Sequence, residues 1–148
     1  MSLQSECEVL QNIPMFGDVD ITKLRLLALS GQRISYQANE EIFHQGDAAT
    51  AVYVLLDGVA EVLREEEEES VSLAKLEGDA IFGETGVLCD TPRGATIRAI
   101  TPVTVLEIDR NTFTEVVRDV PQFALAIARE LARRLEIMNE KFASTSKD

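Results

Sequence analysis

The sequence is poor in the residues that most catalytic and metal-binding sites use. Its 148 residues include one histidine, two cysteines and no tryptophan. A single histidine excludes the metal-binding type of β-barrel that needs several histidine ligands, and two cysteines are too few for an iron–sulfur cluster, which needs about four. No nucleophile, base and orienting residue form a recognisable set. The sequence therefore predicts a protein that is not an enzyme and that has no metal site and no cofactor.

The histidine and the cysteines do not indicate a function of their own. His44 falls on a strand pattern, and we expect it to be structural rather than a ligand or a base. Cys7 and Cys89 supply no disulfide framework of the kind that small secreted proteins have. We expect both thiols to be reduced, buried and inert.

Positive charge and long apolar runs are also scarce. The chain has 14 Lys and Arg residues against 26 Asp and Glu residues, a net charge of −12. This balance argues against a nucleic acid or an anionic membrane as the partner of this chain. No segment approaches the roughly 18 apolar residues of a membrane span, and the N-terminus lacks the basic and apolar regions of a signal peptide. We therefore expect a cytoplasmic protein, and we expect the acidic run at residues 65–69 to be a solvated hairpin loop.

The composition that remains, 45% apolar and 27% charged residues, is typical of one globular domain over residues 1–148. Residues 1–30 have the spacing of short helices, at about 5–11 and 21–29. From residue 31 to 109 the period changes to alternation, with turn signals such as Asp57-Gly58 between the runs. This pattern predicts a mainly β fold with flanking helices, in which eight antiparallel strands form a barrel or jelly roll.

Helical spacing returns over residues 110–142, and residues 143–148 are expected to be a tail. The last helix, at about 121–142, has an apolar stripe that runs over about five turns, which is longer than a small barrel can cover. We expect part of the stripe to contact a second copy of the chain and so to form a homodimer. The stripe consists of Phe123, Ile127, Leu131, Leu135 and Met138.

Residues 82–99 carry the chemistry. An arginine such as Arg93 can hold a phosphate through two parallel hydrogen bonds. A glycine such as Gly83, at the start of a short helical turn, lets backbone N–H groups approach an anion. The carboxylate of Glu84 suits a hydroxyl donor, such as a ribose 2′-OH, rather than a phosphate. Phosphate donors beside a sugar acceptor indicate a nucleotide site, and the alternative is a solvated surface turn.

These features resemble the cyclic nucleotide-binding domain family, which includes the catabolite activator protein, the regulatory subunits of cAMP-dependent protein kinase and cyclic nucleotide-gated channels. In that family the phosphate-binding cassette reads Phe-Gly-Glu, a short helix, and then Pro-Arg-x-Ala-Thr. The cassette here spans residues 82–99. Its matching residues are Phe82, Gly83, Glu84, Pro92, Arg93, Ala95 and Thr96. The resemblance covers nearly the whole chain and extends to Ile13-Pro14-Met15-Phe16, Gln45-Gly46-Asp47, Gly58 and Gly78-Asp79.

The resemblance implies a role for each residue of the cassette. Arg93 would hold the phosphate, Glu84 would accept the ribose 2′-OH, and Gly83 and Ala95 would offer backbone N–H groups. The resemblance thus predicts a ligand site for a cyclic nucleotide, made of Phe82, Gly83, Glu84, Thr85, Arg93, Gly94, Ala95 and Thr96.

The cassette helix and position 94 differ from the common family pattern, and the residue that covers the base is not identified by the resemblance. Most members carry two bulky apolar residues around a small one after the glutamate, whereas here Thr85 and Gly86 precede Val87. A glycine such as Gly86 costs the cassette helix about 1 kcal/mol relative to alanine. Gly94 replaces the threonine that cGMP-selective members commonly carry after the arginine, which favours cAMP over cGMP. The residue that covers the base usually comes from the last helix, where Arg133 or Arg134 could serve or could be a solvated charge.

The sequence therefore predicts a regulatory module that senses a cyclic nucleotide, cAMP in preference to cGMP, and relays binding through its C-terminal helix. Two alternatives remain open. The chain could be the effector domain of a catabolite-activator-type transcription regulator without its DNA-binding part. It could also be a dimerisation or scaffold module whose pocket no longer binds a ligand.

Overall fold

The computed structural model describes residues 3–13 and 16–146, so Pro14 and Met15 of the Ile13-Pro14-Met15-Phe16 segment that resembles the family lie outside the described residues. Within this part of the chain the helices are α1 (Leu3–Asn12), α2 (Ile21–Ser30), α3 (Glu84–Cys89), α4 (Arg110–Asp119) and α5 (Pro121–Ser146). The strands are β1 (Gln32–Tyr36), β2 (Glu41–Phe43), β3 (Ala51–Asp57), β4 (Val59–Glu66), β5 (Glu69–Glu77), β6 (Ala80–Phe82), β7 (Thr96–Ala99) and β8 (Val103–Asp109).

The eight described strands form two four-stranded antiparallel sheets, in the orders β1-β8-β3-β6 and β2-β7-β4-β5. This confirms the predicted mainly β jelly roll with flanking helices. The sheets are not closed into a barrel, because no described strand pairs with strands of both sheets. The two sheets instead pack face to face, and apolar side chains from both fill the space between them.

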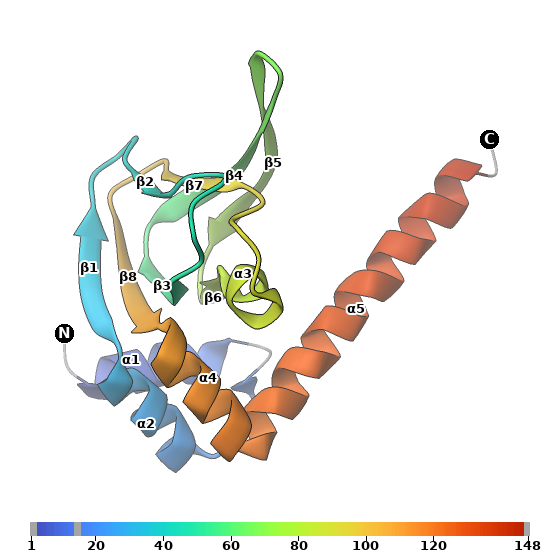
Figure 1. Cartoon of the computed structure of the whole chain (residues 1–148). Helices are drawn as coiled ribbons and strands as arrows, with labels where there is room; N and C mark the ends of the chain where they lie inside the picture. The colour runs from blue at the N-terminus through green and yellow to red at the C-terminus, as the bar shows by residue number, and fades with distance from the viewer. Residues whose placement is uncertain (1–2, 14–15, 147–148) are drawn as a thin grey trace.

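Strand β3 explains why the chain contains the unbroken apolar run at residues 51–56. Its residues Val52 and Val54 belong to a core shared with the helices, whereas Tyr53 and Leu55 belong to the core between the two sheets. Because successive side chains of a strand point to opposite faces, a strand covered on both faces is apolar at every position. β3 therefore joins the two cores, and helices α1, α2 and α4 lie below the sheets (Figure 1).

The helices are set by local caps and by aromatic packing. Asp20 accepts a hydrogen bond from the N–H of Thr22 and caps α2, and Asp109 accepts one from the N–H of Thr112 and caps α4. Phe16 packs edge-to-face on Phe123, with ring centroids 5.3 Å apart. This contact fixes the start of α5 against the N-terminal helical part.

Helix α5 has a packed half and a free half. Phe123 and Ile127 are buried in the helical core, but Leu131, Leu135 and Met138 are 36%, 59% and 63% exposed. Beyond its first turns the helix extends away from the sheets (Figure 1). It continues to Ser146, so residues 143–146, which were predicted as a tail, are helical. Within residues 3–13 and 16–146 no helix combines the length and the apolar character that a membrane crossing requires.

Two smaller predictions were wrong. Most of the acidic run is not loop, because Glu65, Glu66 and Glu69 belong to β4 and β5 and only two residues form the turn between them. The hairpin simply continues beyond the body of the sandwich (Figure 1). Cys7 is buried as expected, but Cys89 is exposed because it ends the short helix α3 on its solvent side.

Candidate functional site

A pocket of about 430 Å³ lies between α3, the segment after α3, and α5. It is lined by every residue of the predicted site except Thr96, and also by Phe43, Leu76, Gly86, Ile97 and Arg134. A hollow of similar size lies between α5 and residues 18–19. Only the first of these two hollows is lined by buried charged groups, Glu84 and Arg93, so it is the candidate site.

The entry to the cassette requires a glycine. β6 ends at Phe82, and Gly83 then takes a left-handed conformation with φ +83° before α3 begins. A Cβ atom there would lie 3.0 Å from Nη1 of Arg93. Gly83 therefore provides both the backbone angle and the space that Arg93 needs.

Arg93 is buried, with 5% of its surface exposed. Its Nη1 donates to the carbonyl of Gly83 at 2.6 Å, and its Nη2 donates to the carbonyl of Ala51 at 2.5 Å. The guanidinium stacks on Phe43, 4.0 Å from the ring centroid. Burial is the main influence on the pKa of Arg93 and lowers it, while Tyr53, Asp47 and Glu84 act to raise it. The group remains a cation, since guanidinium does not lose its proton in proteins.

The backbone of Arg93 is held by a loop that the sequence analysis left out of the site. The N–H of Gly46 donates to the carbonyl of Arg93, and the N–H of Arg93 donates to the carbonyl of Asp47, both at 2.8 Å. Gly46 has φ +95°, a conformation that suits glycine. The Gln45-Gly46-Asp47 motif was the available signal, because a turn of this composition predicts a fixed backbone.

Glu84 is 4% exposed, and its carboxylate accepts a hydrogen bond from Nη1 of Arg134 at 2.8 Å. This pair joins the start of α3 to α5, at the point where α5 leaves the body. Arg133, the other arginine considered for covering the base, does not line the pocket and pairs with Glu130 at 2.7 Å. Sequence reasoning had not paired Glu84 with the last helix.

The other predicted residues have different surroundings. Thr96 is buried, and its hydroxyl accepts a hydrogen bond from the N–H of Gln45 at 2.9 Å instead of lining the pocket. Thr85 lies at the exposed rim, and Gly94 is exposed with open space where a Cβ would be. Ala95 is half-buried and lines the pocket beside Arg93.

Gly86 lowers the helix propensity of α3, but it is also the residue that lets α3 pack closely against its neighbours. It is buried, and a Cβ atom there would lie 2.7 Å from Cβ of Ala49 and 3.1 Å from the carbonyl of Thr91. The helix thus gives up about 1 kcal/mol of propensity so that it can approach the loop before β3. The close approach seats the cassette helix against the sheet.

The comparisons with known proteins agree with this geometry. The family described as "Cyclic nucleotide-binding domain" matches residues 33–120, which is more than half of the chain. An uncharacterized protein of the NTE family from Mycobacterium tuberculosis is 32% identical over 126 residues, which cover 85% of this chain and 21% of that protein. A cAMP-dependent protein kinase regulatory subunit from Schizosaccharomyces pombe is 32% identical over 108 residues, covering 73% of this chain and 26% of that protein.

The crystal structure of the Thermus thermophilus catabolite activator protein has the same fold. It superposes with a TM-score of 0.82 at 28% sequence identity, covering 90% of this chain and 63% of that chain. The present chain spans only about a fifth to a quarter of the two curated relatives described above.

The contact of Gly86 with Ala49 yields a prediction for stability. We expect Gly86→Ala to lower the free energy of unfolding by about 1–3 kcal/mol, because the overpacking outweighs the gain in helix propensity. Urea denaturation followed by circular dichroism measures the change. The double variant Ala49→Gly/Gly86→Ala removes the opposing Cβ and should recover part of the loss. A Gly86→Ala protein more stable than the wild type would contradict this account.

Proposed function

The chain belongs to the cyclic nucleotide-binding domain family, and from this premise we propose that it binds a cyclic nucleotide as a regulatory, non-catalytic sensor. Arg93 holds the phosphate, Glu84 holds the ribose, and the backbone N–H groups of Gly83 and Ala95 complete the cradle. The role of each residue rests on its position in the pocket and on the resemblance of the cassette to that of the family.

The observation that carries the proposal is a buried charge without a counterion. Arg93 is 5% exposed, yet no carboxylate of the described residues lies within ion-pair distance of its guanidinium. Its buried Nε has no hydrogen-bond partner among the described residues. A buried cation is costly unless it is paired, and a bound phosphate would supply both the charge and the acceptor.

The preference for the base rests on Gly94. This residue is exposed and has no side chain that could donate a hydrogen bond to guanine, so we favour cAMP over cGMP. The Schizosaccharomyces pombe relative is named for its dependence on cAMP, which supports the same choice.

Loss of the guanidinium should weaken binding. We expect Arg93→Ala to reduce the affinity for cAMP by roughly 10- to 100-fold, because each charge-assisted hydrogen bond contributes about 1.5–3 kcal/mol. Isothermal titration calorimetry measures the affinity, and urea denaturation checks that the variant folds. Arg118→Ala is the matched control, since Arg118 is exposed and pairs only with its neighbour Asp119.

The same titration of the wild type compares the two nucleotides. Tighter binding of cAMP than of cGMP is the expected outcome. Binding of neither nucleotide would reject the proposed function and would favour a module that acts only in dimerisation or as a scaffold. Tighter binding of cGMP would reject the base preference alone.

We propose that binding is relayed through α5 by the contact of Glu84 with Arg134. A ribose hydroxyl at Glu84 would share or replace the hydrogen bond that this carboxylate accepts from Arg134 at 2.8 Å. The ligand would then shift the population of α5 positions, because it has different contacts with each position. Glu130 strengthens this part of α5, since it lies within ion-pair distance of both Arg133 and Arg134.

A pair of neighbouring arginines tests the relay. In the wild type we expect cAMP to change the hydrogen-exchange rates of backbone amides in α5 beyond residue 130. Arg134→Ala should abolish this change, because it removes the contact with Glu84, while cAMP still binds. Arg133→Ala is the matched control and should retain the change, since Arg133 pairs with Glu130. An equal change in all three proteins would rule out Arg134 as the link.

We also propose that the free half of α5 forms a homodimer. Leu131, Leu135 and Met138 continue the stripe that Phe123 and Ile127 bury in the body, yet all three are exposed in the single chain. Apolar side chains at this spacing are typical of a helix that packs against another helix.

A charge on the stripe should separate the two copies. We expect Leu131→Glu to give a monomer in multi-angle light scattering, because a buried carboxylate without a partner costs several kcal/mol. Arg129→Glu introduces the same side chain on the same helix but off the stripe, and should leave the dimer intact. An unchanged mass for Leu131→Glu would remove the dimer from the proposal.

A second role is consistent with the same site. The chain matches 63% of the length of the Thermus thermophilus catabolite activator protein, so it could serve as the effector domain of a transcription regulator. In either role we propose a cytoplasmic location. We also propose that this chain does not contact nucleic acid or an anionic membrane, since its net charge is −12. The length of the complete gene product would distinguish the two roles.

A further inference from the structure

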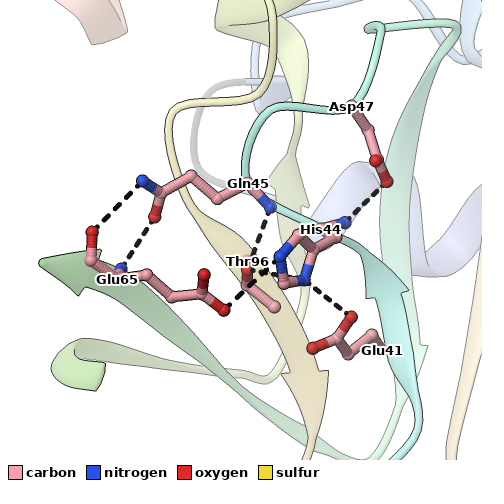
Figure 2. Close-up of polar contacts among 6 residues, drawn as sticks. All are labelled: Glu41, His44, Gln45, Asp47, Glu65 and Thr96. Atoms are coloured by element: carbon pink, nitrogen blue, oxygen red, sulfur yellow. Dashed lines mark hydrogen bonds and ion pairs between the residues drawn. The ribbon is translucent and has the colours of Figure 1, made fainter. Parts of the chain in front are cut away.

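The only histidine of the sequence lies between two carboxylates (Figure 2). His44 directly follows β2. Its Nδ1 lies 2.9 Å from Oε1 of Glu41, the first residue of β2, and its Nε2 lies 3.4 Å from Oε1 of Glu65 on β4. The ring therefore bridges two strands of the second sheet. We call His44, Glu41 and Glu65 the histidine clasp.

Both contacts of the clasp can form fully only when the ring carries two protons. A neutral imidazole has one N–H, so it can donate to Glu41 or to Glu65 but not to both. The imidazolium has two N–H groups and a positive charge, and it suits both carboxylates. A bound metal is not the alternative, because no group of three His, Cys, Asp or Glu side chains among the described residues is arranged to hold one.

The surroundings of the ring favour the protonated form. In the part of the chain that the structure describes, the charged groups that face it are Glu41 from β2, Glu65 from β4 and Asp47 from the loop after β2. The hydrogen bond with Glu41 is the largest influence and raises the pKa of His44 above 6.5; burial opposes it, and the charges of Glu65, Glu41 and Asp47 add to the increase. The ring is partly exposed, so protons reach it from solvent.

The clasp is connected to the cassette through Gln45. The side chain of Gln45 accepts from the N–H of Glu65 at 2.8 Å and donates to the carbonyl of Glu65 at 3.3 Å. The N–H of Gln45 donates to the hydroxyl of Thr96 at 2.9 Å, and that hydroxyl lies 3.5 Å from Nδ1 of His44. Figure 2 shows Thr96 beside the ring of His44, and the side chain of Gln45 extending to the backbone of Glu65.

The next two residues complete the connection. Gly46 and Asp47 make the two backbone hydrogen bonds that hold Arg93, and Oδ2 of Asp47 accepts a hydrogen bond from the N–H of His44 at 2.9 Å. The loop at residues 44–47 thus has the clasp on one side and the backbone of Arg93 on the other. A continuous set of hydrogen bonds therefore connects the clasp to the backbone of Arg93.

We propose that His44 is a positioning residue whose protonation closes the clasp and orders the loop under Arg93, so that the affinity for cyclic nucleotide rises as the pH falls through neutrality. The inference rests on the proposed function and adds a proton as a second effector of the same site. It also gives Thr96 a role: its hydroxyl holds the N–H of Gln45 rather than the ligand.

The direction follows from linkage. Because the folded protein holds the proton of His44 more tightly than an ordinary imidazole does, the closed clasp contributes its full stability below about pH 6.5, and that contribution is lost as the pH rises through the raised pKa. If the closed clasp favours the binding-competent loop, then bound nucleotide must in turn favour the proton on His44. Two independent measurements can therefore test one coupling.

The first measurement is an NMR titration of the imidazole ring, which needs no assignment because the chain has one histidine. We expect the titration midpoint of His44 to be higher with saturating cAMP than without it. Glu65→Gln should lower the midpoint in both states, while its backbone contacts with Gln45 are retained. Glu66→Gln is the matched control on the same strand, since Glu66 pairs with Arg64 and not with the ring.

The second measurement is calorimetry with cAMP at about pH 6 and about pH 8.5, which lie on either side of an imidazole titration. We expect wild-type affinity to fall by about fivefold across this range, the lower end of ordinary coupling between two sites. His44→Gln keeps a hydrogen-bonding side chain but cannot be charged, and its affinity should not change between the two pH values.

The outcomes separate the two proposals. Binding of cAMP with the same midpoint for His44 in both states, or with the same pH dependence in wild type and His44→Gln, overturns the clasp and leaves the proposed function standing. Absence of binding at both pH values overturns the proposed function and the coupling together. A midpoint that Glu65→Gln does not lower overturns the closure of the clasp, whether or not cAMP binds.

Discussion

The burial of one cation that no carboxylate of residues 3–13 and 16–146 pairs with is the constraint on which the rest of this site depends. Arg93 can remain in the protein interior only because backbone carbonyls, an aromatic face and a loop compensate for the water it has lost. Each of these partners requires a particular residue type at its position in the sequence. Gly83 must be a glycine so that its carbonyl can meet the guanidinium, and Phe43 must end β2 where its ring supports that group. Much of the local sequence is thereby explained by one side chain.

The second organising feature is the division of the apolar core by β3. One face of this strand packs on the helices and the other packs inside the sandwich, so the site is attached to both parts of the molecule. Ala51, at the start of β3, accepts a hydrogen bond from Arg93. Phe123 packs the start of α5 into the helical core, and Arg134 of the same helix donates a hydrogen bond to Glu84 of the cassette. The pocket and the last helix are therefore in direct contact within one module.

Much of the fold could be predicted, because the signals involved are periodic and local. The change from helical to alternating spacing near residue 31, and the return near residue 110, agree with the boundaries of the sandwich. The predicted site residues were expected to lie together, and all of them except Thr96 line one pocket. The contacts of individual side chains could not be predicted. Nothing in the pattern shows that Thr96 holds Gln45, that Cys89 faces solvent, or that Gly86 lies against Ala49.

The sequence by itself determined the fold class, the family resemblance and the identity of the phosphate and ribose candidates, because each depends on spacing within a short stretch of chain. Only the tertiary structure decided which groups these candidates touch. Glu84 and Arg134 are 50 positions apart, His44 and Thr96 are 52 apart, and Arg93 and Ala51 are 42 apart. Contacts at such separations depend on how strands pair and how sheets pack, and a single sequence has no periodic signal for them. Arg93 is the clearest example, because only the folded structure shows that no carboxylate in the described part of the chain pairs with its buried guanidinium.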